Sequence, residues 1–178
     1  TLFPYTTLFR SAWANHTCGG GTKQDGLRAE QWDDIFCQAE DMGVSFILLA
    51  GGEPLMRPDV LKMAGRRKNI LFPVFTNGTM IIKEILSGSR NAEPDSGEPQ
   101  TGSEDVDTYL QMFMDNRNLL PVLSIEGDRQ MTDTRRGAGI YDCLIQTMEE
   151  LKARNILYGV SITVTKENME EVTADVFL

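Results

Sequence analysis

Polar and glycine-rich residues follow four apolar runs along the chain, and these residues are the candidates for chemistry. Two adjacent glycines let a ligand approach the backbone closely, and the Glu53 carboxylate after them can meet an ammonium group. Each cluster alone is also ordinary turn chemistry, but four in one order predict a ligand site. The clusters are Gly51-Gly52-Glu53-Pro54, Thr76-Asn77-Gly78, Ser124-Ile125-Glu126-Gly127 and Thr165 to Asn168.

The elements that must position these clusters alternate between helix and strand patterns. Apolar residues at helical spacing cover 30–42, 58–67 and 141–151, and an amphipathic pattern resumes at 107–113. Continuous apolar runs, typical of buried strands, cover 44–50, 70–76, 119–125 and 158–165. Alternating strands and helices predict an α/β fold with a parallel sheet, an incomplete (β/α) partial barrel of about four βα units. Ligands bind such sheets at the carboxyl ends of the strands, where the four clusters stand.

One internal stretch does not fit this alternation. Residues from about 82 to 106 are rich in Gly, Ser, Pro, Glu and Asp, with too few large apolar residues to join a core. We expect a disordered insertion there, with a short helical start at 81–86.

The first eleven residues are unusual in another way. Residues 1–11 match, codon for codon, one reading frame of a common sequencing-library adapter. An extended N-terminal arm is the alternative, because Thr, Phe and Tyr suit strands. We interpret 1–11 as a non-native adapter translation and 12–178 as a partial domain, and we expect the native sequence to be cut at both ends.

Composition excludes several classes of protein. The chain has 17 basic and 26 acidic residues and a net charge of −9, which argues against a nucleic-acid partner. No apolar run is long enough to span a membrane. The three cysteines, Cys18, Cys37 and Cys143, are odd in number and far apart, so we do not expect a disulfide framework. We therefore expect a cytoplasmic location.

The run Leu49-Ala50-Gly51-Gly52-Glu53-Pro54-Leu55 resembles the radical S-adenosylmethionine (radical SAM) superfamily. The second strand of that superfamily ends in a Gly-Gly-Glu-Pro motif that contacts the SAM amino group. The segment 75–79 resembles its third-strand motif, and 123–127 its fourth, where a serine hydroxyl bonds SAM. The segment Asp133 to Gly137 resembles the one that opens the following helix, where an arginine can pair with the SAM carboxylate. The resemblance spans 13–81 and 107–175.

This resemblance implies a TIM-like (β/α)6 core and an enzyme that reductively cleaves SAM at a [4Fe–4S] cluster. The product is a 5′-deoxyadenosyl radical that abstracts hydrogen from an unknown substrate, a peptide or a small molecule, and an electron donor must serve the cluster. Arg135 and Arg136 are equally interpretable as a solvated surface pair. The SAM-binding residues that the resemblance implies are Gly51, Gly52, Glu53, Pro54, Thr76, Asn77, Ser124, Glu126 and Arg136.

The sequence departs from the superfamily at the cluster. No Cys-x3-Cys-x2-Cys segment is present. Trp13-Ala14 resembles the pair of an aromatic and a small residue that often follows the last of these cysteines in the superfamily, so we expect the cysteines upstream in the parent protein. We therefore assign no metal ligand and no catalytic residue to this chain and expect it to be inactive alone. The rival hypothesis is a cluster-free α/β module that binds a nucleoside or a peptide. A phosphate-binding barrel enzyme is disfavoured because no P-loop motif is present.

Overall fold

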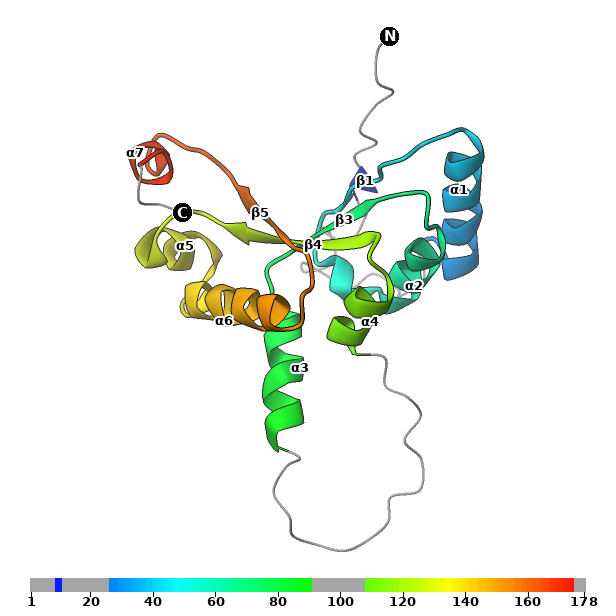
Figure 1. The fold of residues 1–178 in the computed structure, drawn as a ribbon. Helices are drawn as coiled ribbons and strands as arrows, with labels where there is room; N and C mark the ends of the chain where they lie inside the picture. Colours follow the sequence, from blue (N-terminus) through cyan, green and yellow to red (C-terminus); the bar gives the residue numbers. More distant parts are fainter. Residues whose placement is uncertain (1–8, 11–25, 91–107, 175–178) are drawn as a thin grey trace, which may run out of the picture.

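The computed structural model describes residues 9–10, 26–90 and 108–174, which build an α/β fold on one parallel sheet (Figure 1). Each connection between consecutive strands carries at least one helix, as parallel pairing requires. The predicted α/β partial barrel is confirmed. The strands lie in the order β1 (Phe9–Arg10), β2 (Leu49–Ala50), β3 (Phe72–Thr76), β4 (Leu119–Ile125) and β5 (Gly159–Ile162), each parallel to its neighbour.

Local sequence signals set the helix boundaries. Pro58 occupies the first turn of its helix, where a missing N–H costs nothing, and the side chains of Thr108 and Asp128 cap two others. None of the helices in the described ranges is long and apolar enough to cross a membrane. The helices are α1 (Ala29–Asp41), the 3-10 turn η2 (Pro54–Met56), α2 (Pro58–Arg66), α3 (Thr79–Arg90), α4 (Tyr109–Asp115), α5 (Arg129–Arg136), α6 (Ile140–Ala153) and α7 (Met169–Val172).

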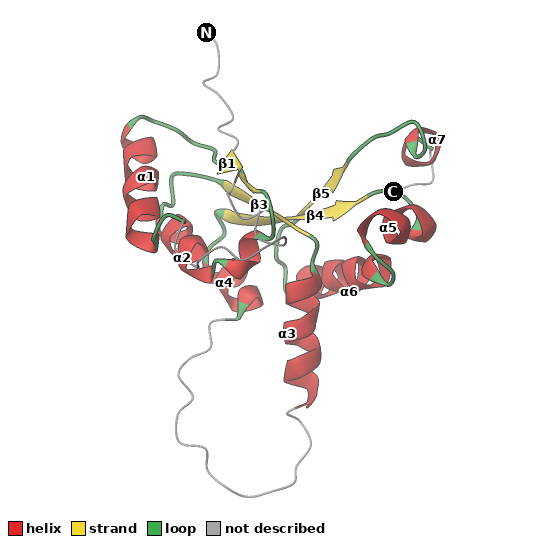
Figure 2. Ribbon diagram, turned by 180° about the vertical axis from the view of Figure 1, so that it is seen from behind, coloured by secondary structure: helices red, strands yellow, loops and turns green. Residues whose placement is uncertain are grey.

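The core lies between the sheet and the helices that cover one of its faces. In both ribbon views α2, α3, α4 and α6 lie on the same side of the sheet, and no described helix lies against the other side (Figures 1 and 2). Phe72, Val74 and Leu123 of the sheet are fully buried in this core, and Phe36 of α1 meets Phe72 edge to face at 5.0 Å. Each such side chain contributes about 1.5–3 kcal/mol on burial.

The strand register separates core residues from residues on the bare face. Val74, Thr76 and Leu123 belong to the face that packs on the helices, and Thr76 pairs with Leu123. Side chains alternate along a strand, so Phe75 and Ser124 belong to the opposite face, where both are half-buried. Because all strands are parallel, the carboxyl ends of β2 to β5 meet at one edge.

The expected disordered insertion at 82–106 is corrected in its first part, because α3 runs to Arg90. Ile81 and Ile82 are buried, and the Glu84 carboxylate accepts hydrogen bonds from the backbone N–H groups of Tyr109 and Leu110. The composition of the whole stretch hid this helix, because the Gly- and Pro-rich residues after it dominate the count. The rest of the predicted insertion, 91–106, lies outside the described residues.

Two strands are shorter than their apolar runs. Of the predicted strand at 44–50, only Leu49–Ala50 is regular, although Phe46 forms an isolated bridge with Leu71. Of the run at 158–165, only Gly159–Ile162 pairs in the sheet. A strand is regular only where it shares a ladder of hydrogen bonds with a neighbour: β2 pairs with two residues of β1 and through Leu49 with β3, and β5 pairs with the last four residues of β4.

The predicted division of the chain at residue 11 is not tested by the fold. Phe9–Arg10 forms β1 and pairs with Leu49 and Ala50, and residues 1–8 and 11–25 lie outside the described ranges. The origin of 1–11 as an adapter translation therefore stays a prediction.

Candidate functional site

The chain leaves β2 through two glycines in backbone conformations that suit glycine. Gly51 has φ +95° and Gly52 has φ +46°, where a side chain would strain the backbone. Pro54 then starts η2, and the Glu53 side chain turns back to accept a hydrogen bond from Leu55 N at 3.2 Å. The cluster predicted as a ligand loop is therefore a tight turn that fixes one carboxylate.

The Glu53 carboxylate also reaches the end of the next strand. Its Oε2 atom accepts hydrogen bonds from Thr76 Oγ1 at 2.9 Å and from Asn77 N at 3.2 Å. A carboxylate offers about four lone-pair sites. Three donors, one from η2 and two from the end of β3 and the residue after it, orient Glu53 and leave capacity for one more. The structure thus brings Glu53, Thr76 and Asn77 together.

Thr76 and Asn77 hold the turn that starts α3. Thr76 is only 2% exposed, and its hydroxyl accepts from Gly78 N at 3.1 Å while it donates to Glu53. Asn77 Oδ1 accepts from the backbone and the hydroxyl of Thr79 at 3.0 and 2.7 Å, an Asx turn. The side chain of Thr76 therefore lies on the helix-covered face and orients Glu53.

Ser124 lies at the same edge on the bare face of the sheet. It pairs in register with Ser161 of β5 and is half-buried. The β2 end that leads to Glu53 stands two strands away, roughly 10 Å at usual strand spacing. The predicted placement of Gly51, Gly52, Glu53 and Ser124 at one carboxyl edge is confirmed, whereas a shared cleft stays a prediction.

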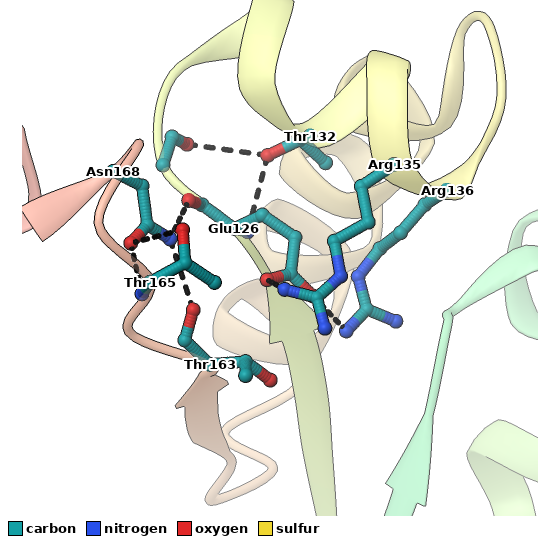
Figure 3. A network of polar contacts seen from close by, with 8 residues as sticks. Glu126, Thr132, Arg135, Arg136, Thr163, Thr165 and Asn168 are labelled. Atoms are coloured by element: carbon teal, nitrogen blue, oxygen red, sulfur yellow. Dashed lines mark hydrogen bonds and ion pairs between the residues drawn. The ribbon is translucent and has the colours of Figure 1, made fainter.

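A buried carboxylate and two arginines follow β4 (Figure 3). Glu126 is 2% exposed, its Oε2 accepts a hydrogen bond from Arg135 at 2.9 Å, and its Oε1 forms an ion pair with Arg136. Burial of a charge is costly unless it is paired, and here two cations surround one anion. The three groups together keep a net positive charge. Arg136 Nε has no hydrogen-bond partner among the described residues.

Asn168, at the end of the β5–α7 loop, joins this network (Figure 3). Its Nδ2 donates to Glu126 O at 2.7 Å and to Thr163 O at 2.9 Å, and its Oδ1 accepts from Thr165 N at 2.7 Å. A hollow of about 410 Å³ opens beside it, with α5 on one side and the β5–α7 loop on the other; its walls include Asp128, Met131, Thr134, Arg135, Thr165 and Glu167.

Asp133 fixes the junction between α5 and α6. Its two carboxylate oxygens accept from Tyr141 N at 2.8 Å and from Gly139 N at 3.0 Å. These backbone N–H groups, Tyr141 first, hold the pKa of Asp133 below its usual value. Gly137 ends α5 with φ +116°. The segment from Asp133 to Gly137 therefore both supplies the arginines and starts α6.

A metal centre is not found within the described ranges. No three His, Cys, Asp or Glu side chains of these residues gather closely enough to hold a metal ion. Cys37 and Cys143 are separate half-buried thiols, and His16 and Cys18 lie outside the described residues. The described part of the chain does not fit a cluster that needs three thiolates.

The structure divides the predicted site residues into two groups at one edge. Glu53, Thr76 and Asn77 form the first with the two glycines, and Glu126 and Arg136 form the second, near Ser124. Sequence reasoning left Arg135 undecided and included Asn168 only as the last residue of the fourth strand-end cluster. The polar run after the fourth strand was the signal for Asn168, but its partner Glu126 is 42 residues away.

Comparisons with known proteins give curated relatives that match most of this chain at low identity. No family model matches the sequence. The AdoMet-dependent heme synthase of Methanosarcina barkeri is 25% identical over 149 residues, 83% of this chain and 36% of the relative. The mycofactocin maturase MftC of Mycolicibacterium smegmatis is 24% identical over 162 residues, 88% of this chain and 36% of the relative. The chain spans about a third of the length of these relatives.

Solved structures share the fold. Streptococcus suis SuiB bound to its precursor peptide SuiA superposes with a TM-score of 0.60 at 20% identity, covering 84% of this chain and 29% of SuiB. Native anSMEcpe with bound AdoMet and the Cp18Cys peptide gives 0.56 at 15% identity, covering 83% of this chain and 38% of that one. The fold described above is therefore shared with a protein whose structure was solved with bound AdoMet.

Proposed function

We propose that the chain is the SAM-holding part of a larger enzyme of the radical SAM superfamily, the superfamily that its curated relatives indicate. The site is the carboxyl edge of the parallel sheet, where Gly51, Gly52 and Glu53 stand at one position and Ser124, with the arginine pair, at another. The observation that carries the proposal is the Glu53 carboxylate, which three donors, one from η2 and two from the end of β3 and the residue after it, hold in one orientation.

Glu53 is the group that would receive the SAM ammonium. It is only partly buried, so a cation can reach it, and it retains a free acceptor site. Because Leu55, Thr76 and Asn77 already orient the carboxylate, little side-chain entropy remains to be lost on binding. The positive φ angles of Gly51 and Gly52 allow the backbone to turn beside the ligand.

The arginine pair is the group that would receive the SAM carboxylate. Arg136 Nε is a buried donor without an acceptor among the described residues, and a carboxylate is the acceptor that arginine binds best. Glu126 neutralises only one of the two cations. We therefore assign Glu126 to holding the arginines and Ser124 to a hydroxyl contact with SAM.

The [4Fe–4S] cluster is assigned to the parent protein, outside the described residues, because these do not fit it. SAM held by Glu53 and Arg136 would supply radical hydrogen abstraction to the parent protein if a reduced cluster were bound beside it. The part of this chain is to bind and orient SAM, and we expect no cleavage by the chain alone. The substrate, a peptide or a small molecule, and the electron donor are recognised by the parent protein.

SAM titration of the ¹⁵N-labelled chain, followed by NMR, tests this function. We expect the amide signals of Gly51, Gly52 and Asn77 to shift and those of Leu71 and Asn118, at the opposite edge, to stay. Glu53→Gln removes the charge but keeps the shape. It should weaken SAM binding about ten- to a hundredfold, because a hydrogen bond to a charged group is worth about 1.5–3 kcal/mol.

Two controls sharpen the result. Glu150→Gln neutralises an exposed carboxylate that pairs with Arg154 on α6 and should leave SAM affinity unchanged. Adenosine lacks the ammonium, so its affinity should not depend on Glu53. Equal binding of adenosine and SAM, with no effect of Glu53→Gln, would instead support the cluster-free nucleoside-binding module.

A further inference from the structure

The turn after β4 is held from two sides by side chains. β4 ends at Ile125, so no strand ladder satisfies the backbone of Glu126. Its N–H donates to Thr132 Oγ1 at 3.2 Å, and its C=O accepts from Asn168 Nδ2 at 2.7 Å. Thr132 also donates to Gly127 O, and Gly127 turns the chain with φ +138°. Two side chains therefore replace the hydrogen bonds that a neighbouring strand would supply.

Asn168 is the long-range member of this arrangement. It is 4% exposed, and all of its polar groups are used: two donations, to Glu126 O and Thr163 O, and acceptance from both the N–H and the hydroxyl of Thr165. A buried amide costs stability unless it is fully hydrogen-bonded. The four bonds satisfy that condition and join β5 to the end of β4.

The position of Glu126 decides the position of the arginines. Its carboxylate is the acceptor for both guanidinium groups. The Arg135 side chain is 47% exposed. Figure 3 shows both guanidinium groups at the Glu126 carboxylate. A shift of the Glu126 backbone would therefore carry the cationic pair with it.

We propose that Asn168 is a positioning residue for the SAM site, because its amide fixes the Glu126 turn that places Arg135 and Arg136. This inference rests on the function proposed above. Asn168 contacts no ligand in this scheme and acts through Glu126.

The chain contains a matched control at the other end of the same strand. Asn118 Nδ2 donates to three backbone carbonyls, those of Ala64, Arg67 and Ile70, at 3.1, 3.0 and 3.3 Å. It ties the start of β4 to the loop before β3, as Asn168 ties the end of β4 to the loop after β5. The seven residues of β4 separate the two by roughly 20 Å.

The test compares Asn168→Asp with Asn118→Asp in the 178-residue chain. Each change keeps the shape and replaces an amide donor by an oxygen that faces carbonyls, and each should lower the free energy of unfolding. Asn168→Asp also keeps the acceptor for Thr165, so the loop turn itself is retained. SAM affinity is measured from the Gly51 and Gly52 amide shifts at a temperature where both variants are folded.

We expect Asn168→Asp to weaken SAM binding about tenfold, the effect of one lost buried hydrogen bond, and Asn118→Asp to change it less than about twofold. In the absence of SAM, the Glu126 amide, whose N–H donates to Thr132 Oγ1, should exchange with solvent faster in Asn168→Asp, relative to Leu123 in the same sample. If both variants alter SAM affinity equally, Asn168 has only a structural role and the inference fails. If the unaltered chain binds no SAM, the proposed function fails first.

Discussion

Glu126→Gln gives a direct measure of what the buried carboxylate contributes. The substitution keeps volume and one acceptor but removes the charge that Arg135 and Arg136 share. Removal of one partner from a buried ion pair costs about 3–5 kcal/mol. Arg135 and Arg136 remain 47% and 26% exposed, so water can solvate them again, and we expect a smaller loss of about 2–3 kcal/mol.

Urea unfolding followed by circular dichroism measures this loss. A domain of this size has about 5–15 kcal/mol of stability, so the variant should still fold and show an earlier midpoint. The control is Glu150→Gln, whose pair with Arg154 is more than one-third exposed on both sides and contributes at most about 1 kcal/mol. A loss for Glu126→Gln no larger than for Glu150→Gln would refute the burial argument.

Three further substitutions test the turns around the site. Gly78→Ala should destabilise the fold by about 1–3 kcal/mol, because φ is +74° and the new Cβ would stand 3.2 Å from Thr147 Oγ1. Gly139→Ala has a similar φ of +81° but open space, so thermal unfolding should show a smaller shift. Asp133→Asn should make the free energy of unfolding less dependent on acid pH. Folding lowers the pKa of Asp133, so its carboxylate stabilises the fold above the unfolded pKa of about 3.9, and this stabilisation is lost as the pH falls through the folded pKa. Equal urea midpoint changes between pH 7 and pH 3 in both proteins would exclude this role.

Long, strongly periodic segments were predictable from sequence. The strand at 119–125 and the helix at 30–42 agree with β4 and α1 within one residue, because burial on one or both faces dictates each residue type. The strand at 44–50 was predicted too long because its regularity depends on what its neighbours offer. Only 81–86 of α3 was predicted as helical, whereas the helix runs from Thr79 to Arg90.

The sequence was sufficient to predict which sheet edge carries the site residues, but not which side chains contact one another there. Parallel topology alone brings Glu53 and Ser124 to one edge, so the motif order was sufficient. That Thr76 is buried against the helices, or that Glu126 holds two arginines, depends on side-chain packing across many residues. The role of Asn168 depends on a contact 42 residues away, which no local pattern records.

The contact between Glu84 and the first turn of α4 makes the meeting of α3 and α4 independent of the number of residues between these helices. This carboxylate joins positions 25 residues apart in sequence, so α3 and α4 meet at a fixed junction whatever lies between them. The entropy of closing a flexible loop rises only with the logarithm of its length, by about 0.6 kcal/mol for each doubling. The junction between α3 and α4 is therefore a place where this domain can gain or lose sequence at little cost to the sheet, and where a reporter peptide could be inserted without disturbing the edge that carries Glu53.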